Sequence, residues 1–132
     1  MKELFGYGAE TRGITVRVSV SYLPEQSKPE QGRWFWAYHV RIENGAGQSA
    51  QLISRNWIIT DGRGTRHSVE GEGVVGEQPM IEPDGSFDYV SGCPLSTPTG
   101  SMEGSYRMIG EDGEFFDVAI PKFPLIAPAV TQ

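Results

Sequence analysis

The sequence of 132 residues predicts an all-β protein, a seven-stranded β-sandwich built from two aligned antiparallel sheets. Three observations lead to this prediction. Short segments alternate between apolar and polar residues, turn residues separate them at short intervals, and no segment has the period of a helix. Because the chain has one cysteine, Cys93, it lacks the Cys–Trp–Cys core of antibody domains, and the fibronectin type III-like form of the immunoglobulin-like sandwich is the closer analogue.

The first two strands carry the clearest pattern. Residues 14–22 place an apolar side chain at every second position, which is typical of a half-buried strand. Residues 34–43 alternate in the same way and are rich in aromatic residues, which favour strands. Residues 1–13 are polar and contain glycine, so we expect a loose N-terminal arm. Residues 24–32 hold two prolines and predict a polar loop.

Five further strands follow, separated by segments that contain turn residues such as glycine, proline, asparagine and aspartate. They are expected at residues 50–60, 65–70, 86–91, 101–109 and 114–120. Alternation breaks near residues 54–56, which predicts a bulge or a bend in the third strand, and the polar residues of the fourth suit a sheet edge. Proline cannot donate to a neighbouring strand, so Pro121 and Pro124 are expected to end the pairing of the last strand.

Composition and charge limit the possible functions. With 38% hydrophobic residues, the chain is long enough for one domain whose core needs no disulfide or metal. The net charge of -6 disfavours binding to nucleic acid and to an anionic membrane, since both need a basic surface. No apolar run approaches the length of a membrane-spanning helix and no signal-peptide pattern opens the chain, so we expect no membrane insertion. The single cysteine favours a reducing compartment, and the expected location is the cytoplasm.

A glycine-rich stretch is the most suggestive motif. Gly71, Gly73 and Gly76 match the G-x-G-x-x-G pattern of dinucleotide-binding loops, and their backbone N–H groups could form a concave array that holds a phosphate. That pattern is informative when a helix follows, whereas here Gln78 and Pro79 follow and no helical pattern comes after them. The alternative is a connection between strands in which the glycines supply positive φ angles, and a β-rich context favours this alternative.

Few side chains could support metal binding or catalysis. His39, His67 and Cys93 could be soft metal ligands, but they fall on separate segments without the spacings of a zinc site. The glutamates within residues 70–77 could offer oxygens to a hard cation, although a solvated acidic loop is the commoner case. The metal prediction is therefore left open. The residues around Cys93 could expose its thiol, although a buried cysteine is commoner. No nucleophile has an evident base, so we predict no catalytic residues, no cofactor and no enzymatic activity.

Three consecutive aromatic residues form a candidate interaction surface. Trp34, Phe35 and Trp36 must place rings on both faces of one strand. One face is expected to join the core, and the other is covered by a loop, by the N-terminal arm or by a partner. An aromatic patch left on a sheet face would mark a protein interface, and an edge strand could also be extended by a second chain.

Longer motifs run through most of the chain, including WFWAY at residues 34–38 and GEGVVGEQP at residues 71–79. Others lie at residues 16–18, 22–27, 42–44, 51–55, 57–61, 89–95, 100–106 and 115–125. In these motifs the chain resembles the bacterial ApaG proteins. The resemblance implies an ApaG domain at residues 14–126, preceded by the N-terminal arm at 1–13 and followed by a C-terminal tail at 127–132.

The resemblance also carries expectations about function. It implies a fibronectin-type sandwich and a bacterial cytosolic protein linked to cobalt resistance and magnesium efflux. Similar domains in eukaryotic multidomain proteins look like protein-interaction modules. The glycine-rich stretch of the family has invited a proposal of pyrophosphate binding, and Gly71, Gly73 and Gly76 match that stretch.

Two main hypotheses follow. The first is a non-enzymatic interaction module linked to divalent-cation homeostasis, with an unidentified protein partner and a homodimer as one form of association. The alternative is a small-ligand sensor that binds a phosphate, a pyrophosphate or a divalent cation at residues 71–76. An enzyme that acts on nucleotides or phosphoanhydrides ranks last, since it needs a base and usually a metal.

Overall fold

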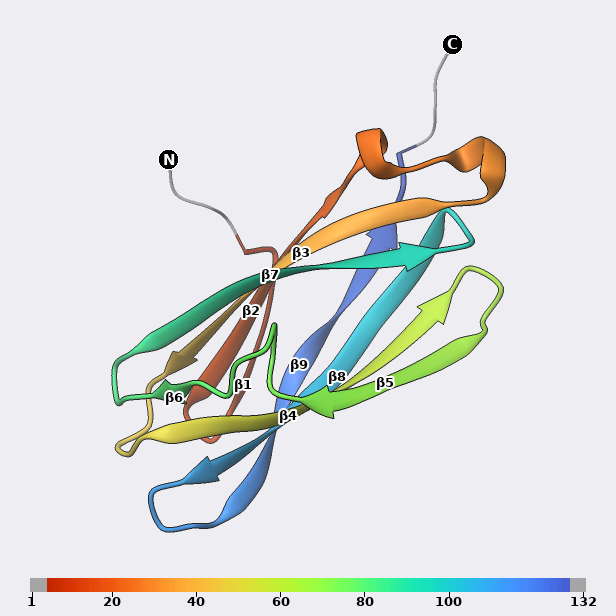
Figure 1. The fold of residues 1–132 in the computed structure, drawn as a ribbon. Helices are drawn as coiled ribbons and strands as arrows, with labels where there is room; N and C mark the ends of the chain where they lie inside the picture. Colours follow the sequence, from red (N-terminus) through yellow and green to blue (C-terminus); the bar gives the residue numbers. More distant parts are fainter. Residues whose placement is uncertain (1–4, 129–132) are drawn as a thin grey trace.

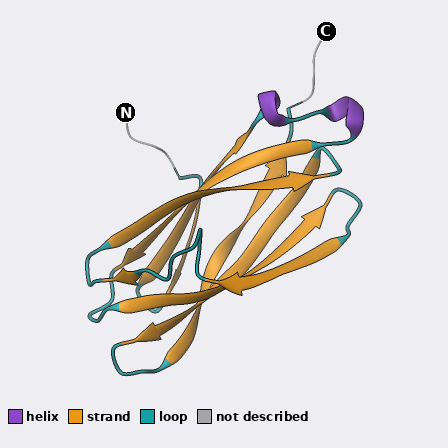
Figure 2. Cartoon of the chain, viewed as in Figure 1, coloured by secondary structure: helices purple, strands orange, loops and turns teal. Residues whose placement is uncertain are grey.

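The computed structural model describes residues 5–128, which fold into two antiparallel β-sheets packed face to face (Figures 1 and 2). The first sheet has the strand order β1-β2-β3-β7, and the second has the order β5-β4-β8-β9, with β6 paired to β4. The first sheet comprises β1 (Tyr7–Thr11), β2 (Ile14–Tyr22), β3 (Trp34–Asn44) and β7 (Ser86–Leu95). The second comprises β4 (Ala50–Asp61), β5 (Arg66–Glu72), β6 (Met80–Ile81), β8 (Thr99–Gly110) and β9 (Phe115–Ile126).

The predicted all-β sandwich is confirmed, and each of the seven predicted strands is present, together with β1 and β6, which the sequence did not predict. The described residues contain two short 3-10 helices, η1 (Pro24–Gln26) and η2 (Pro29–Gln31), both within the predicted polar loop. The register of β4 against β8 shifts between Leu52 and Ser54, beside the predicted irregularity. The polar strand β5 pairs only with β4, so it is an edge strand as predicted. Within residues 5–128, no helix is long and apolar enough to cross a membrane.

The core lies between the two sheets and is built around large aromatic side chains. Trp36, Tyr106 and Phe123 are the largest of the fully buried ones. The ring of Trp57 lies 6.1 Å from that of Phe123 and 5.3 Å from that of Tyr38, both in edge-to-face geometry. Burying a large apolar side chain contributes about 1.5–3 kcal/mol. A core of this kind explains how the sandwich holds together without a disulfide.

The N-terminal segment is not a loose arm over its whole length. Residues 7–11 form β1, which pairs with β2 from Tyr7, opposite Val18, to Thr11, opposite Ile14. The side chain of Thr11 also accepts a hydrogen bond of 3.1 Å from the backbone N–H of Ala119 in β9. Pairing with β2 decides the conformation, since the five residues of β1 are too few and too polar to show a strand pattern. Residues 1–4 of the predicted arm lie outside the described residues.

The expectation that prolines end the last strand is wrong. Strand β9 continues past Pro121 and Pro124 to Ile126, with Pro124 opposite Ser101 of β8. Because β9 is an edge strand with one hydrogen-bonded neighbour, a proline can lie in it where no N–H is needed. Burial of Phe123 and Leu125 holds this part of the strand against the core.

The two long sides of the sandwich differ. On one side β1 packs beside β9, so the edges of the two sheets are in contact. On the other side the edges are β7 of the first sheet and β5 of the second. Figure 1 shows these two strands at neighbouring edges, with the short strand β6 between β7 and β4 on the same side. The functional features described below lie on or near this second side.

Candidate functional site

The glycine-rich stretch forms the end of β5 and the tight turn that follows it. Gly73 and Gly76 have φ angles of +63° and +82°, so both occupy the left-handed region that favours glycine. A Cβ atom at Gly73 would lie 2.2 Å from the carbonyl oxygen of Glu77, which leaves no room for a side chain. At Gly71 a Cβ atom would instead meet the guanidinium group of Arg55 at 2.9 Å. Each of these three glycines therefore has a structural reason, and two of them supply positive φ as the alternative interpretation expected.

Most backbone donors of this turn are already used inside the chain. The N–H of Gly73 donates to the carbonyl of Ile53 at 2.8 Å, and the N–H groups and carbonyls of Val74 and Glu77 are bonded to each other at 2.8 and 2.9 Å. Among the described residues, the N–H groups of Val75 and Gly76 are the ones left over in the turn. The phosphate-binding prediction stays a prediction, and it now depends on these two donors.

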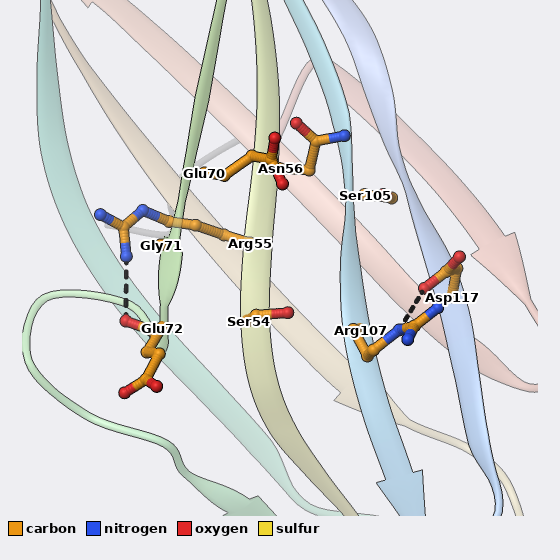
Figure 3. A pocket seen from close by; sticks show the side chains of 9 residues that line it. All are labelled: Ser54, Arg55, Asn56, Glu70, Gly71, Glu72, Ser105, Arg107 and Asp117. Atoms are coloured by element: carbon orange, nitrogen blue, oxygen red, sulfur yellow. Dashed lines mark hydrogen bonds and ion pairs between the residues drawn. The ribbon is translucent and has the colours of Figure 1, made fainter.

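The side chain of Arg55 is hydrogen-bonded to the backbone of the glycine-rich stretch, and this residue was not identified from the sequence. Its Nη1 atom donates to the carbonyl oxygen of Glu72 at 3.0 Å (Figure 3) and to that of Gly73 at 2.8 Å. The guanidinium lies against Gly71, whose missing side chain makes room for it. The signal that could have revealed this role is the pairing of a glycine on an edge strand with a long side chain on its neighbour, which requires the strand register.

The outer face of the second sheet has a shallow polar depression of about 460 Å³ beside this stretch. Figure 3 shows its lining, which includes Ser54, Asn56, Glu70, Ser105, Arg107 and Asp117. Arg107 and Asp117 form an ion pair of 3.3 Å between side chains that are more than half exposed. Exposed pairs contribute little to stability, so this face behaves as a solvated sheet surface.

The candidate metal ligands are not brought together. Nowhere in residues 5–128 do three or more histidine, cysteine, aspartate or glutamate side chains form a group that could hold a metal ion. His39, His67 and Cys93 lie on three different strands, β3, β5 and β7. The residues present therefore do not fit a cobalt or magnesium site, and no step of the proposed function passes through a bound metal.

Cys93 is a buried core residue and not an exposed thiol. Its side chain is 2% exposed, and burial raises the pKa of the thiol to about 11. The thiolate is the reactive form of cysteine, so this group is unreactive at neutral pH. The suggestion that the Gly-Cys-Pro sequence exposes the thiol is wrong, and the commoner buried arrangement is confirmed.

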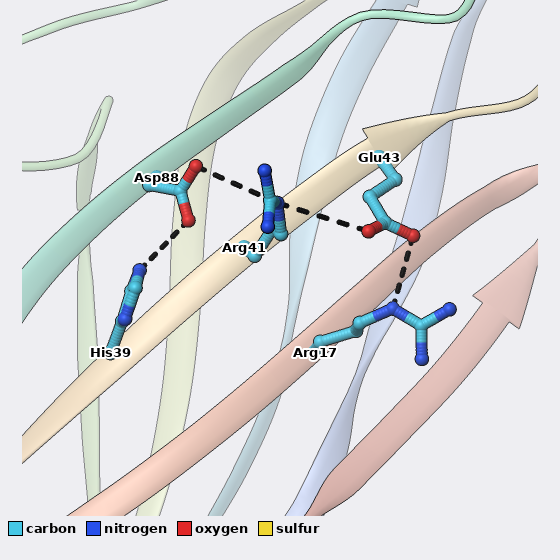
Figure 4. Close-up of polar contacts among 5 residues, drawn as sticks. All are labelled: Arg17, His39, Arg41, Glu43 and Asp88. Carbon is cyan, nitrogen blue, oxygen red and sulfur yellow. Dashed lines mark hydrogen bonds and ion pairs between the residues drawn. The ribbon is translucent and has the colours of Figure 1, made fainter. Parts of the chain in front are cut away.

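The outer face of the first sheet carries a ladder of charged side chains (Figure 4). Arg17 contacts Glu43 at 3.0 Å, and His39 contacts Asp88 at 2.8 Å. Arg41 lies between the two carboxylates at 3.8 and 3.7 Å. Opposite charges on neighbouring strands support the register of β2, β3 and β7.

The aromatic run is split between the core and the surface. Trp36 is 1% exposed and its indole donates to the carbonyl of Ile126 at 3.2 Å, so its inclusion in an interaction surface is wrong. Strand alternation places the neighbouring side chain of Phe35 on the other face, where its ring covers Gly92 so closely that a Cβ there would lie 2.6 Å from it. Trp34 is half-buried against the edge of the core. The candidate surface thus reduces to Trp34 and Phe35.

A cluster of buried tyrosines was also not predicted from the sequence. The hydroxyl groups of Tyr89 and Tyr106 are hydrogen-bonded to each other across the two sheets. Burial raises the pKa of both hydroxyls and that of Tyr38, while the positive charge of Arg55 opposes the rise in all three. These phenols are therefore neutral at physiological pH, and they place polar groups inside the sandwich near Arg55.

Comparison with known proteins gives consistent matches. The family model for the ApaG domain matches residues 24–110. Protein ApaG of Afipia carboxidovorans is 53% identical over 126 residues, which cover 96% of this chain and 97% of the relative. Protein ApaG of Pseudomonas paraeruginosa is 57% identical over 115 residues, which cover 87% and 91%. The crystal structure of the ApaA protein from Bordetella pertussis has a TM-score of 0.85 at 50% identity, covering 89% of this chain and 95% of that chain.

Proposed function

This chain belongs to the ApaG family, and we propose that it acts as a non-enzymatic protein-interaction module. The observation that carries the proposal is the free edge of β7. This strand is 10 residues long, and β3 is its one partner within the described chain. Unpaired backbone groups along such an edge are a template for a strand from another protein.

The middle of β7 leaves this edge unprotected. From Val90 to Cys93 the strand has no charged residue and no proline, and Val90 is 60% exposed. Proteins usually guard a free edge with charges or by keeping it short. Strand β5, the edge of the other sheet, is guarded in this way, since it is shorter and carries Arg66, Glu70 and Glu72. The contrast between the two edges favours β7 as the docking strand.

As part of this proposal, any effect on cobalt or magnesium homeostasis is exerted through the partner. A protein whose described residues offer no cation cluster can still change cation transport by binding a regulator or a transporter component. The expected cytoplasmic location fits such a role and is part of the proposal. A second copy of the chain is one occupant of the edge, which would give a homodimer.

Affinity capture with matched variants tests this function. Wild-type protein, Val90→Lys and Ile126→Lys are immobilised and exposed to lysate of the source cells, and bound proteins are quantified by mass spectrometry. Val90 and Ile126 are both 60% exposed aliphatic residues on edge strands, but they lie on different strands, β7 and β9. We expect a partner that wild type and Ile126→Lys retain and Val90→Lys loses, because a lysine discourages pairing at that edge. Equal recovery by all three proteins would refute β7 as the docking strand, and light scattering of the same proteins tests self-association.

A second candidate function is a sensor for phosphate or pyrophosphate at Gly71, Gly73 and Gly76. The N–H groups of Val75 and Gly76 support it, since they are the donors that the turn leaves free among the described residues. Thermal unfolding with pyrophosphate tests it, because a ligand at 100 times its Kd adds about 2.7 kcal/mol to stability. A saturable rise in Tm would support the sensor, and an unchanged Tm would exclude it at the concentrations used.

A further inference from the structure

A crevice of about 250 Å³ opens on the side of the sandwich where β7 and β5 form the sheet edges. Its floor consists of buried side chains, among them Tyr38, Trp57 and Met102. Ile59 and Val69 add apolar surface, and Val69 is itself partly exposed at the rim. Apolar and polar groups together line this space, as in sites for small organic molecules.

One charged side chain lines this otherwise mostly apolar crevice. Arg55 is half-buried, and its two hydrogen bonds both leave from Nη1 toward backbone carbonyls. A guanidinium has five N–H donors, so the three on Nε and Nη2 have no acceptor among residues 5–128. No carboxylate of the described chain forms an ion pair with Arg55. Nη1 is therefore held by two backbone carbonyls, while the donors of Nε and Nη2 remain available to a ligand.

The titratable groups that lie near Arg55 on the crevice side carry no negative charge. Burial keeps the hydroxyls of Tyr38, Tyr89 and Tyr106 neutral, and it also keeps the thiol of Cys93 neutral. The Tyr38 hydroxyl and the Arg55 guanidinium thus line the crevice together, and none of its other lining residues is acidic. An anion with two oxygen acceptors matches a guanidinium fork better than a neutral group does.

We propose that this crevice binds a carboxylate attached to a compact apolar group, with the carboxylate on Arg55 and the apolar group over Trp57 and Val69. The apolar lining favours such a ligand over phosphate, which has no surface to bury there. Two sources share this chemistry, a free small acid and the C-terminal residue of a peptide. The site is separate from the outward-facing backbone turn at Val75 and Gly76 and does not depend on a partner at the free edge of β7.

Pairs of acids and amides of equal shape test the proposal. 4-Methylpentanoate is compared with 4-methylpentanamide, and a tetrapeptide ending in leucine is compared with its amidated form. Binding is followed in ¹H–¹⁵N spectra through the indole N–H of Trp57 and the Nε–H of Arg55. We expect saturable shifts with millimolar to high-micromolar Kd for an acid and binding about tenfold weaker or more for its amide, since a hydrogen bond to a charged group is lost. The free acid binding alone identifies a metabolite site, and the peptide acid binding more tightly identifies a C-terminus site.

Two variants locate the site without depending on each other. Arg55→Gln removes the charge, and we expect it to abolish the preference for acid over amide. Val69→Phe fills the crevice from its rim and leaves Arg55 in place, so it should weaken binding of the acid about tenfold or more. Val90→Phe is the control, because Val90 lies on the outer face of β7, and it should bind the acid like wild type. If Arg55→Gln fails to fold, the amide comparison and Val69→Phe still decide. Equal binding of acid and amide, unchanged binding by Val69→Phe, or no shift at any soluble concentration of acid would each overturn the proposal.

Discussion

Replacing Gly73 by alanine separates the backbone geometry of the glycine-rich turn from any ligand that the turn binds. Gly73 has a φ of +63°, and a Cβ atom there would lie 2.2 Å from the carbonyl oxygen of Glu77. The left-handed conformation costs an alanine about 1–2 kcal/mol. Relieving the contact requires a shift of the backbone, which adds about 1–3 kcal/mol. We therefore expect Gly73→Ala to lower the free energy of unfolding by about 2–5 kcal/mol.

Gly76 is the matched control for this substitution. Its φ is +82°, but a Cβ atom there would have no neighbour within 4 Å. Gly76→Ala therefore carries the conformational cost without the clash, and we expect a loss of about 1–2 kcal/mol. Urea unfolding of both variants in ligand-free buffer measures the difference in the free energy of unfolding. In a thermal unfolding experiment, each kcal/mol lost should lower Tm by about 3–5 °C for a domain of this size.

The comparison has a clear refuting result. If Gly73→Ala loses no more stability than Gly76→Ala, the close approach of the Glu77 carbonyl is not what requires glycine at position 73. Full stability of both variants would go further and show that the turn adopts another conformation in solution. In that case the hydrogen bonds that occupy the N–H groups of Gly73 and Val74 could not be assumed either.

Three further predictions concern the core and the turns. Trp36→Ala should destabilise the protein by about 3–5 kcal/mol in urea unfolding, because it empties a fully buried site, and a loss below about 1 kcal/mol would contradict the buried placement. Although burial opposes the effect, N–H groups of Thr65 and Arg63 hold the pKa of Asp61 below its ordinary value of 3.8. The stabilisation that this provides is present above the unfolded-state pKa and is lost as pH falls through the folded-state pKa. Asp61→Asn should therefore have a lower Tm than wild type at neutral pH. On acidification below about pH 4, its Tm should change less than that of wild type. Cys93 should react with a thiol reagent at pH 8 only at the rate of unfolding, and fast labelling of the native protein would contradict its burial.

Periodicity predicted the strands whose side chains alternate, and it failed where a partner strand decides the conformation. The alternation of residues 14–22 is visible in the sequence because one face of β2 is buried. Residues 7–11 become a strand because β2 offers a free edge, which no local pattern of five residues reveals. Strand β9 continues past Pro121 because it too lies at an edge, and this position depends on the topology of the whole sheet.

The candidate site was harder to predict than the fold because its residues act through the register of neighbouring strands. The aromatic run showed that rings would lie on both faces of β3, but the alternation alone did not say which ring would be buried. Arg55 looks like an ordinary polar residue in a strand until its pairing with Gly71 on β5 is known. A guanidinium that crosses an edge strand needs a glycine in its path, and the two residues are 16 positions apart in the chain.

The match to a dinucleotide-binding pattern has a physical origin that needs no nucleotide. In such loops the glycines allow a close approach of backbone to pyrophosphate and a tight turn into a helix. Here Gly71 allows the close approach of a guanidinium, and Gly73 allows the close approach of the Glu77 carbonyl in a tight turn that leads to β6. The same steric requirement, the absence of a Cβ atom, thus produces the same G-x-G-x-x-G pattern, although the group that approaches the glycines is a guanidinium or a carbonyl and not a pyrophosphate. Because the guanidinium that Gly71 admits also lines the crevice between the sheet edges, these glycines bear on binding at that crevice through the placement of Arg55.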